Sequence, residues 1–211
     1  MEGRHFMNAN LNLLIGLAMG LNLLALGSSR LPAVIRAMSA QGVILGVMPV
    51  IIEHELDWRV ALIAVATVAG KGLVIPALLR RAMRAANIDR ELQPLIGFVP
   101  SLLLGAGGAI AALALAQVLP LLPEHTGSLL MPGALATVLT GFILLIGRTK
   151  AISQVCGYLI LENGIYLFGL LIIKAMPLLV EAGVLLDLTV GVFIIGIIVD
   201  RIQRAFDSLD T

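Results

Sequence analysis

Residues that hold metal ions or form disulfides are scarce in this chain. Cys156 is the single cysteine among 211 residues, which excludes an internal disulfide and a cysteine-rich iron–sulfur or structural zinc site within the chain. The three histidines, His5, His54 and His125, are far apart in sequence and show no metal-ligand spacing. We therefore predict no catalytic residue, metal ion or cofactor in this chain, so any redox chemistry would have to take place elsewhere.

Charged residues are also few. They make up 13% of the chain, whereas soluble domains carry roughly 25%, and 59% of the residues are hydrophobic. Apolar runs of roughly 20 residues follow one another with short polar breaks, and each run is long enough to cross a bilayer as a helix. The predicted fold class is therefore an all-α integral membrane protein surrounded by lipid, with no nucleic-acid partner. No small-residue cleavage pattern follows residues 1–10, so we expect no cleaved signal peptide.

We predict about seven transmembrane helices, at about 9–28, 32–52, 59–80, 95–120, 129–147, 151–174 and 178–200. When the connecting loops are assigned to alternate sides of the membrane, Arg4, Arg59 and Lys174 fall on one side. The other side receives ten basic residues: Arg30, Arg36, Arg80, Arg81, Arg84, Arg90, Arg148, Lys150, Arg201 and Arg204. Cytoplasmic loops carry an excess of Lys and Arg, so we predict a cytoplasmic C-terminus and an external N-terminus.

A weak internal repeat occurs at a spacing of 120 residues. The matching positions are Leu24, Gly27, Arg81, Arg84 and Ala85 in the first copy, and Leu144, Gly147, Arg201, Arg204 and Ala205 in the second. This repeat predicts two parallel three-helix units, 1–93 and 123–211, joined by a connecting transmembrane helix within 94–122. Few positions are identical, so chance similarity is the alternative.

Small residues and a proline mark two of the predicted helices. The fourth helix contains the stretch LGAGGA at 104–109, where Gly105 and Gly108 leave room for a neighbouring helix to approach closely. We interpret this stretch as an ordinary helix contact. Pro76 interrupts the third helix and predicts a kink there, because proline has no backbone N–H group.

Three ionisable residues fall inside the predicted helices: Lys71, Glu162 and Asp187. A charge at the bilayer centre costs at least about 2.5 kcal/mol, so such groups usually face protein or water and mark a proton or ion route. Burial favours the uncharged form of each group, which allows proton exchange. The alternative is a static ion pair between Lys71 and a carboxylate that holds helices together. We favour proton handling because three such groups occur in one small bundle.

Polar neighbours extend this predicted path. Asn163 follows Glu162, and Tyr158 and Tyr166 lie one turn before and after it, so this helix face can hydrogen-bond a chain of water molecules. Ser39 and Gln41 lie in the second predicted helix. They serve either helix-to-helix hydrogen bonds, which we favour, or an extension of the polar path.

The same residues carry a resemblance to a known family. The stretches GYLILENG at 157–164, PLLVE at 177–181 and DLTVG at 187–191 resemble component E of the hydrogenase-four type of formate hydrogenlyase complexes. The similarity runs along nearly the whole chain. Lys71 and Pro76, in GKGLVIP, match a lysine-bearing helix in the N-terminal half of that family.

From about Leu129 onward the chain is also similar to the K subunit of bacterial complex I and to the small subunit of multisubunit sodium/proton antiporters. In the K-subunit pattern one buried acid lies on the second helix, and another lies on the third helix four residues before a glycine. Asp187 and Gly191 match the third-helix spacing. Glu162 lies one turn beyond the acid expected on the second helix, on roughly the same face.

This resemblance implies a membrane-arm subunit of a complex-I-like group 4 nickel–iron hydrogenase in the cytoplasmic membrane of a bacterium or archaeon. The implied partners are antiporter-like membrane subunits and a peripheral hydrogenase-like arm, which would hold the nickel–iron centre and the iron–sulfur clusters. This non-catalytic subunit of an oxidoreductase complex would contribute Lys71, Glu162 and Asp187 to a proton or ion translocation path. The alternatives are a stand-alone secondary transporter and a passive scaffold that anchors the peripheral arm.

Overall fold

The computed structural model describes residues 2–52, 57–86, 94–119, 128–173 and 182–193, together with positions 176, 178, 180 and 196; the side chains of residues 2–8 are not described. The helices are α1 (Glu2–Gly27), α2 (Leu31–Ile52), α3 (Trp58–Thr67), α4 (Ile75–Ala85), α5 (Phe98–Val118), α6 (Leu130–Gly147) and α7 (Ala151–Ile172). A π-helical segment, η1 (Val68–Val74), joins α3 to α4 without a break. A shorter apolar helix, Ala182–Phe193, follows α7.

The all-α membrane fold is confirmed. Within the described ranges, 6 helical segments are long and apolar enough to cross a membrane, and they agree with the first six predicted helices to within a few residues. The seventh, predicted at 178–200, corresponds to the shorter Ala182–Phe193 helix, and residues 197–200 lie outside the described part of the chain. The predicted division into three units also stays a prediction, because residues 87–93, 120–127 and 201–205 are among those not described.

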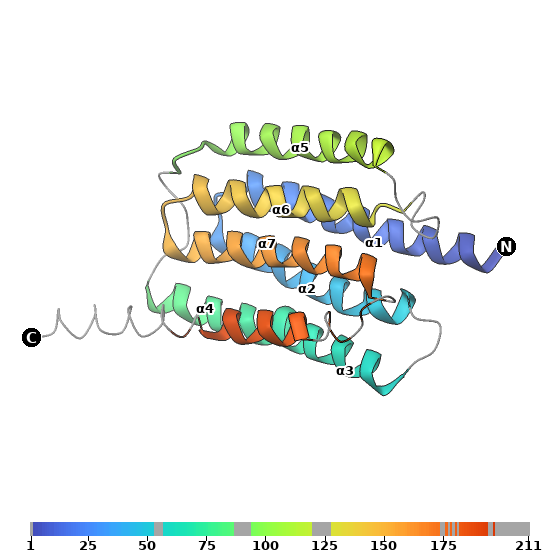
Figure 1. Cartoon of the computed structure of the whole chain (residues 1–211). Helices are drawn as coiled ribbons and strands as arrows, with labels where there is room; N and C mark the ends of the chain where they lie inside the picture. Colours follow the sequence, from blue (N-terminus) through green and yellow to red (C-terminus); the bar gives the residue numbers. More distant parts are fainter. Residues whose placement is uncertain are drawn as a thin grey trace, which may run out of the picture.

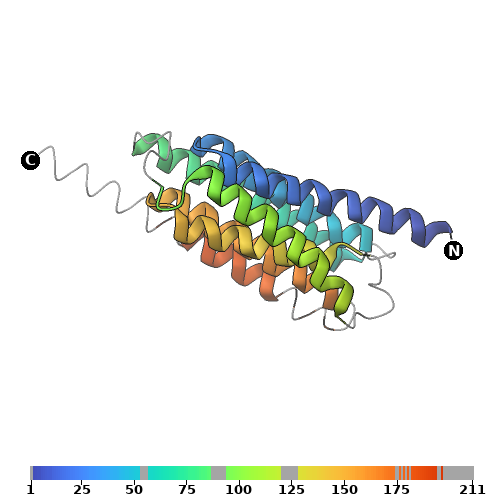
Figure 2. The same ribbon diagram turned by 90° about the horizontal axis from the view of Figure 1, so that it is seen from above.

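The helices pack as two layers with α5 at one edge (Figures 1 and 2). One layer contains α1, α2 and the continuous α3–η1–α4 segment, and the other contains α6, α7 and the Ala182–Phe193 helix. Contacts between the layers run from α1 to α6, from α2 to α7 and from α4 to α7. Helices α2 and α7 therefore occupy the centre of the bundle, where side chains are shielded from lipid.

Glycines bring α6 and α7 close together. A Cβ atom added at Gly141 of α6 would lie 2.5 Å from the backbone nitrogen of Leu161 in α7. Gly157 and Gly164, two turns apart on α7, face α6 equally closely, since a Cβ at either position would lie within 2.7 Å of α6 backbone nitrogen. Packing rather than water exclusion drives helix association in lipid, so these glycines explain why α6 and α7 form the most extensive helix pair in the described part of the chain.

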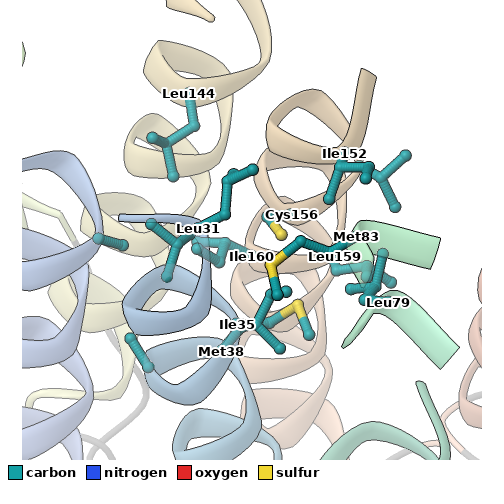
Figure 3. Close-up of a cluster of buried hydrophobic side chains, with 14 of the residues drawn as sticks. Leu31, Ile35, Met38, Leu79, Met83, Leu144, Ile152, Cys156, Leu159 and Ile160 are labelled. Carbon is teal, nitrogen blue, oxygen red and sulfur yellow. The ribbon is translucent and has the colours of Figure 1, made fainter. Parts of the chain in front are cut away.

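Apolar side chains fill the bundle between these helices at the end where α1 and α6 terminate. Figure 3 shows this cluster, in which side chains from α2, α4, α6 and α7 meet: Leu31, Ile35, Met38, Leu79, Met83, Leu144, Ile152, Cys156, Leu159 and Ile160. Cys156 is fully buried here and acts as a small apolar residue. The cluster fixes the rotation of α2 and α7, which carry polar residues nearer the middle.

Helix α5 packs through the small residues that the sequence singled out. A Cβ atom at Gly105 would collide with the side chain of Leu26 in α1, and one at Gly108 would lie 3.2 Å from Leu139 in α6. The interpretation of this stretch as a helix contact is therefore confirmed, whereas Gly107 meets nothing within 4 Å. The outer side of α5 carries exposed apolar residues such as Val99 and Leu103.

Basic side chains gather at one end of the bundle, where α1 ends and α2 begins. Among the described residues these are Arg30, Arg36, Arg80, Arg81, Arg84, Arg148 and Lys150, with Arg59 at the opposite end. The structure does not describe five of the predicted basic residues: the side chain of Arg4, and Arg90, Lys174, Arg201 and Arg204. It also does not describe the side chains of His5, His54 and His125. The predicted orientation across the membrane stays a prediction.

Arg148, which the sequence places in a connecting loop, is buried. It is 2% exposed, and its guanidinium group donates to Leu26 O at 2.7 Å and to Ile96 O at 2.9 Å. Leu26 belongs to the last turn of α1, whose carbonyl groups lack helical partners, so a buried cation is favourable there. Arg148 thus joins the end of α1 to the segment before α5.

The close α6–α7 contact yields a stability prediction. Gly141→Leu should lower the free energy of unfolding by about 3 kcal/mol or more, because the new side chain would collide with the backbone of α7. Gly107→Leu is the matched control, since its position is open and its helix equally apolar. Thermal unfolding of the purified protein in detergent measures both changes. Equal effects of the two substitutions would contradict the tight α6–α7 packing.

Candidate functional site

The π-helical segment η1 places Lys71 in the interior of the bundle. Pro76 lies in the first turn of α4 and has no N–H group, so it cannot donate to Gly72 O four residues earlier. The hydroxyl of Ser39 donates to Gly72 O instead, at 2.6 Å. The interruption predicted at Pro76 is therefore a widened turn in the preceding residues, and wide turns of this kind recur at functional sites.

Two glycines of α2 allow this segment to pack closely. A Cβ atom at Gly42 would lie 2.7 Å from the carbonyl carbon of Lys71, and one at Gly46 would lie 2.5 Å from the side chain of Val68. The spacing of the two glycines, four residues apart on α2, is a small-residue contact motif of membrane helices. It holds the backbone of η1 directly against the centre of the bundle.

Lys71 forms an ion pair with Asp187. Its ammonium nitrogen lies 3.2 Å from Asp187 Oδ2, and the side chains are 5% and 22% exposed. The ammonium group also lies 5.8 Å from the centre of the Tyr166 ring, within the range of a cation–π contact. The structure thus brings together two of the three predicted ionisable residues from elements 116 positions apart in sequence.

Glu162 completes the group of ionisable residues. It is 3% exposed, and neither of its carboxyl oxygens makes a hydrogen bond of regular geometry within the described residues. Lys71, Asp187 and the hydroxyl of Tyr158 all lie within electrostatic reach of this carboxyl group. One ammonium group therefore lies within electrostatic reach of two acids, of which Asp187 is its ion-pair partner.

A ladder of buried amides runs from this group across the bundle. Asn163 Nδ2 donates to Gln41 Oε1 at 3.3 Å, and Gln41 Nε2 donates to Asn22 Oδ1 at 2.6 Å and to Ala18 O at 3.0 Å. Asn22 Nδ2 donates to Thr137 Oγ1 at 2.9 Å, and that hydroxyl donates to Gly133 O. We call Asn163, Gln41, Asn22 and Thr137 the amide ladder. It joins α7, α2, α1 and α6.

The remaining predicted polar residues are placed differently. Ser39 and Gln41 make the helix-to-helix hydrogen bonds that we favoured, although Ser39 bonds a backbone carbonyl and lies apart from the ladder. Tyr166 is buried beside Lys71, and its hydroxyl has no partner of regular geometry in the described chain. Tyr158 is half-buried and lies near Glu162. None of these contacts establishes a continuous water chain.

Sequence reasoning missed several polar residues of the interior, among them Asn22, Thr67 and Thr137. All three are uncharged, so they do not stand out as ionisable residues do. Asn22 offered a signal, because an amide in the middle of a transmembrane helix requires hydrogen-bond partners. Its partners could not be read from the sequence, since they lie on α2 and α6.

A groove lies beside the ion pair, between α7 and the Ala182–Phe193 helix. Its volume is about 290 Å³, and Tyr166, Gly169, Val184 and Asp187 are among its lining residues. Asp187 therefore contacts the ammonium group of Lys71 on one side and this groove on the other. Within the described residues no cluster of acids, histidines or cysteines is arranged to hold a metal ion.

The chain is similar to curated proteins along its length. It is 33% identical over 209 residues to the uncharacterized protein Rv0085 of Mycobacterium tuberculosis, a match that covers 96% of this chain and 95% of the relative. It is 29% identical over 144 residues to hydrogenase-4 component E of Escherichia coli K12, covering 66% of this chain and 65% of that protein. The component E of Shigella flexneri gives the same values. No profile of a known protein family matches the chain, and no solved structure is significantly similar to it.

The ion pair yields a second stability prediction. Lys71→Met removes the counter-charge of Asp187 and should lower the free energy of unfolding by about 3 kcal/mol. The double variant Lys71→Met, Asp187→Leu should recover most of this loss, because apolar side chains can replace a buried ion pair at little cost. Thermal unfolding in detergent tests both. A double variant as unstable as Lys71→Met alone would mean that Asp187 does not depend on Lys71.

Proposed function

We propose, from the premise that the chain belongs to the same family as Rv0085 of Mycobacterium tuberculosis, that it is a membrane subunit of a hydrogenase-type respiratory complex. The similarity to hydrogenase-4 component E supports this assignment, and the apolar helices support a multi-pass location in the inner membrane. In that complex the chain contributes Lys71, Glu162 and Asp187 to a path for protons or other ions. It has no catalytic role of its own.

The observation that carries the proposal is a buried ion pair that has a second, buried acid within electrostatic reach. Lys71 and Asp187 compensate each other, and Glu162 lies within electrostatic reach of both. A second uncompensated negative charge in this low-dielectric interior would be costly, so ionisation of one acid opposes ionisation of the other. When Asp187 takes up a proton and Glu162 releases its own, Lys71 is therefore free to interact with the Glu162 carboxylate.

This exchange gives the site two states with the same total charge. In the first, Asp187 is ionised and Glu162 carries the proton. In the second, Asp187 carries the proton and Glu162 is ionised. Neither state leaves an unpaired charge inside the bundle, and a neighbouring subunit can bias the choice between them through Asp187, which lines the groove beside α7. Such bias is how a redox event elsewhere in a complex would drive proton movement through this chain.

The proposed partners are antiporter-like membrane subunits and a peripheral arm with nickel–iron and iron–sulfur chemistry of the formate hydrogenlyase type. The apolar outer side of α5 and the groove at Asp187 are two of the described surfaces open to other membrane helices. The cluster of basic residues at one end of the bundle supports a cytoplasmic position for that end.

Purification under native conditions tests membership in a complex. A tagged full-length chain, extracted in mild detergent and identified by mass spectrometry, should bring larger membrane subunits and a hydrogenase-like peripheral arm in constant ratio. A chain that purifies alone or as a homo-oligomer would instead support a stand-alone transporter.

Conservative substitutions test the proton path. Glu162→Gln and Asp187→Asn keep side-chain size but cannot ionise, so each should leave the complex assembled and reduce proton movement per redox turnover at least tenfold. Asp57→Asn is the control, because Asp57 is exposed at the start of α3 and away from the ion pair. Redox-driven pH change in vesicles that contain the purified complex measures the effect. Wild-type proton movement in both variants would assign the acids to structure alone.

A further inference from the structure

A small cavity lies between the ion pair and the amide ladder. Its volume is about 10 Å³, and it is lined by Met38, Lys71, Ile75, Leu159 and Asn163. A cavity of about 10–15 Å³ accommodates one water molecule if polar groups are present to bind it. The other three lining residues are apolar, so any polar contact in the cavity has to come from Lys71 and Asn163.

Both polar lining residues have unused hydrogen-bonding capacity. Asn163 is 2% exposed, and its Oδ1 atom has no hydrogen-bond partner within the described residues. The ammonium group of Lys71 has three N–H donors, whereas it has one hydrogen-bonded partner, Asp187, and one ring contact, Tyr166. A buried amide oxygen without a partner is costly, particularly in a membrane protein.

We propose that this cavity binds one water molecule that accepts a hydrogen bond from Lys71 and donates one to Asn163 Oδ1. The water joins the ion pair to the amide ladder, which then forms one hydrogen-bonded string from η1 through α7, α2 and α1 to Gly133 O in α6. Thr137 and Asn22 become positioning residues for Lys71, although they lie on helices that do not hold it.

The direction of the hydrogen bonds supports this link. Every donor in the ladder points away from Lys71, from Asn163 to Gln41, from Gln41 to Asn22 and from Asn22 to Thr137. The amide oxygens, which are the negative ends of the dipoles, are therefore directed toward the ammonium group. This common orientation stabilises the positive charge of Lys71, and successive hydrogen bonds in a string strengthen one another.

Two threonines of α6 allow a matched test of this coupling. Thr137 and Thr140 are both buried, and each hydroxyl donates to its own helix four residues earlier, but Thr137 also accepts the ladder bond from Asn22. The loss of melting temperature caused by Thr137→Val should be smaller by about 2 °C or more in a Lys71→Met background than in the wild type. Thr140→Val should give the same shift in both backgrounds.

Thermal unfolding of the full-length chain in lipid nanodiscs measures each threonine substitution in both backgrounds, wild type and Lys71→Met. Additive effects of Thr137→Val and Lys71→Met would overturn the proposed link. A second, independent measurement uses the wild-type structure at a resolution where other buried waters are visible. It should show one water within about 3.2 Å of Lys71 Nζ and Asn163 Oδ1, and its absence would also overturn the proposal. Both readouts concern the geometry of the bundle, so they do not depend on whether the chain moves protons.

Discussion

A charge inside a membrane protein must be stabilised by other polar or charged groups of the protein. In this bundle the charge is that of Lys71, and the interior residues around it meet that requirement. The ammonium group is paired with Asp187, faces the ring of Tyr166 and lies within reach of Glu162. These residues come from η1, α7 and the Ala182–Phe193 helix, so the positions of three separate segments depend on one cation. Breaking this match would expose a charge to a medium that cannot solvate it.

Close helix packing makes this match possible. Gly42 and Gly46 let η1 lie directly against α2, and the glycines of α6 and α7 hold those helices at short distance. The hydroxyl of Ser39 satisfies the carbonyl group that Pro76 cannot. In lipid, small side chains and one hydroxyl group therefore allow the close helix packing that water exclusion drives in a soluble core. They keep the polar groups of the interior within hydrogen-bonding distance of one another.

The sequence allowed the path of the chain through the membrane to be predicted more fully than its interior contacts. A helix that crosses a bilayer needs roughly 20 apolar residues, so composition and spacing locate the crossings. The three ionisable residues inside the helices were equally visible, since Lys71, Glu162 and Asp187 interrupt apolar runs. Which acid pairs with Lys71 depends on helix rotation, which is set by packing and by the π-helical segment. The neutral residues Asn22 and Thr137 escaped notice because they carry no charge.

The widened turn at η1 gives its helix a degree of freedom that a regular helix lacks. Each residue of an α-helix advances by about 100° around the axis. A π turn accommodates one extra residue while the helical turns on either side keep their positions. Such a turn can move along a helix by exchanging hydrogen bonds one at a time. Its passage would change the azimuth of Lys71 between α2, α7 and the Ala182–Phe193 helix while α3 and α4 stay in place. The widened turn therefore sets the azimuth of Lys71 separately from the orientation of α3 and α4.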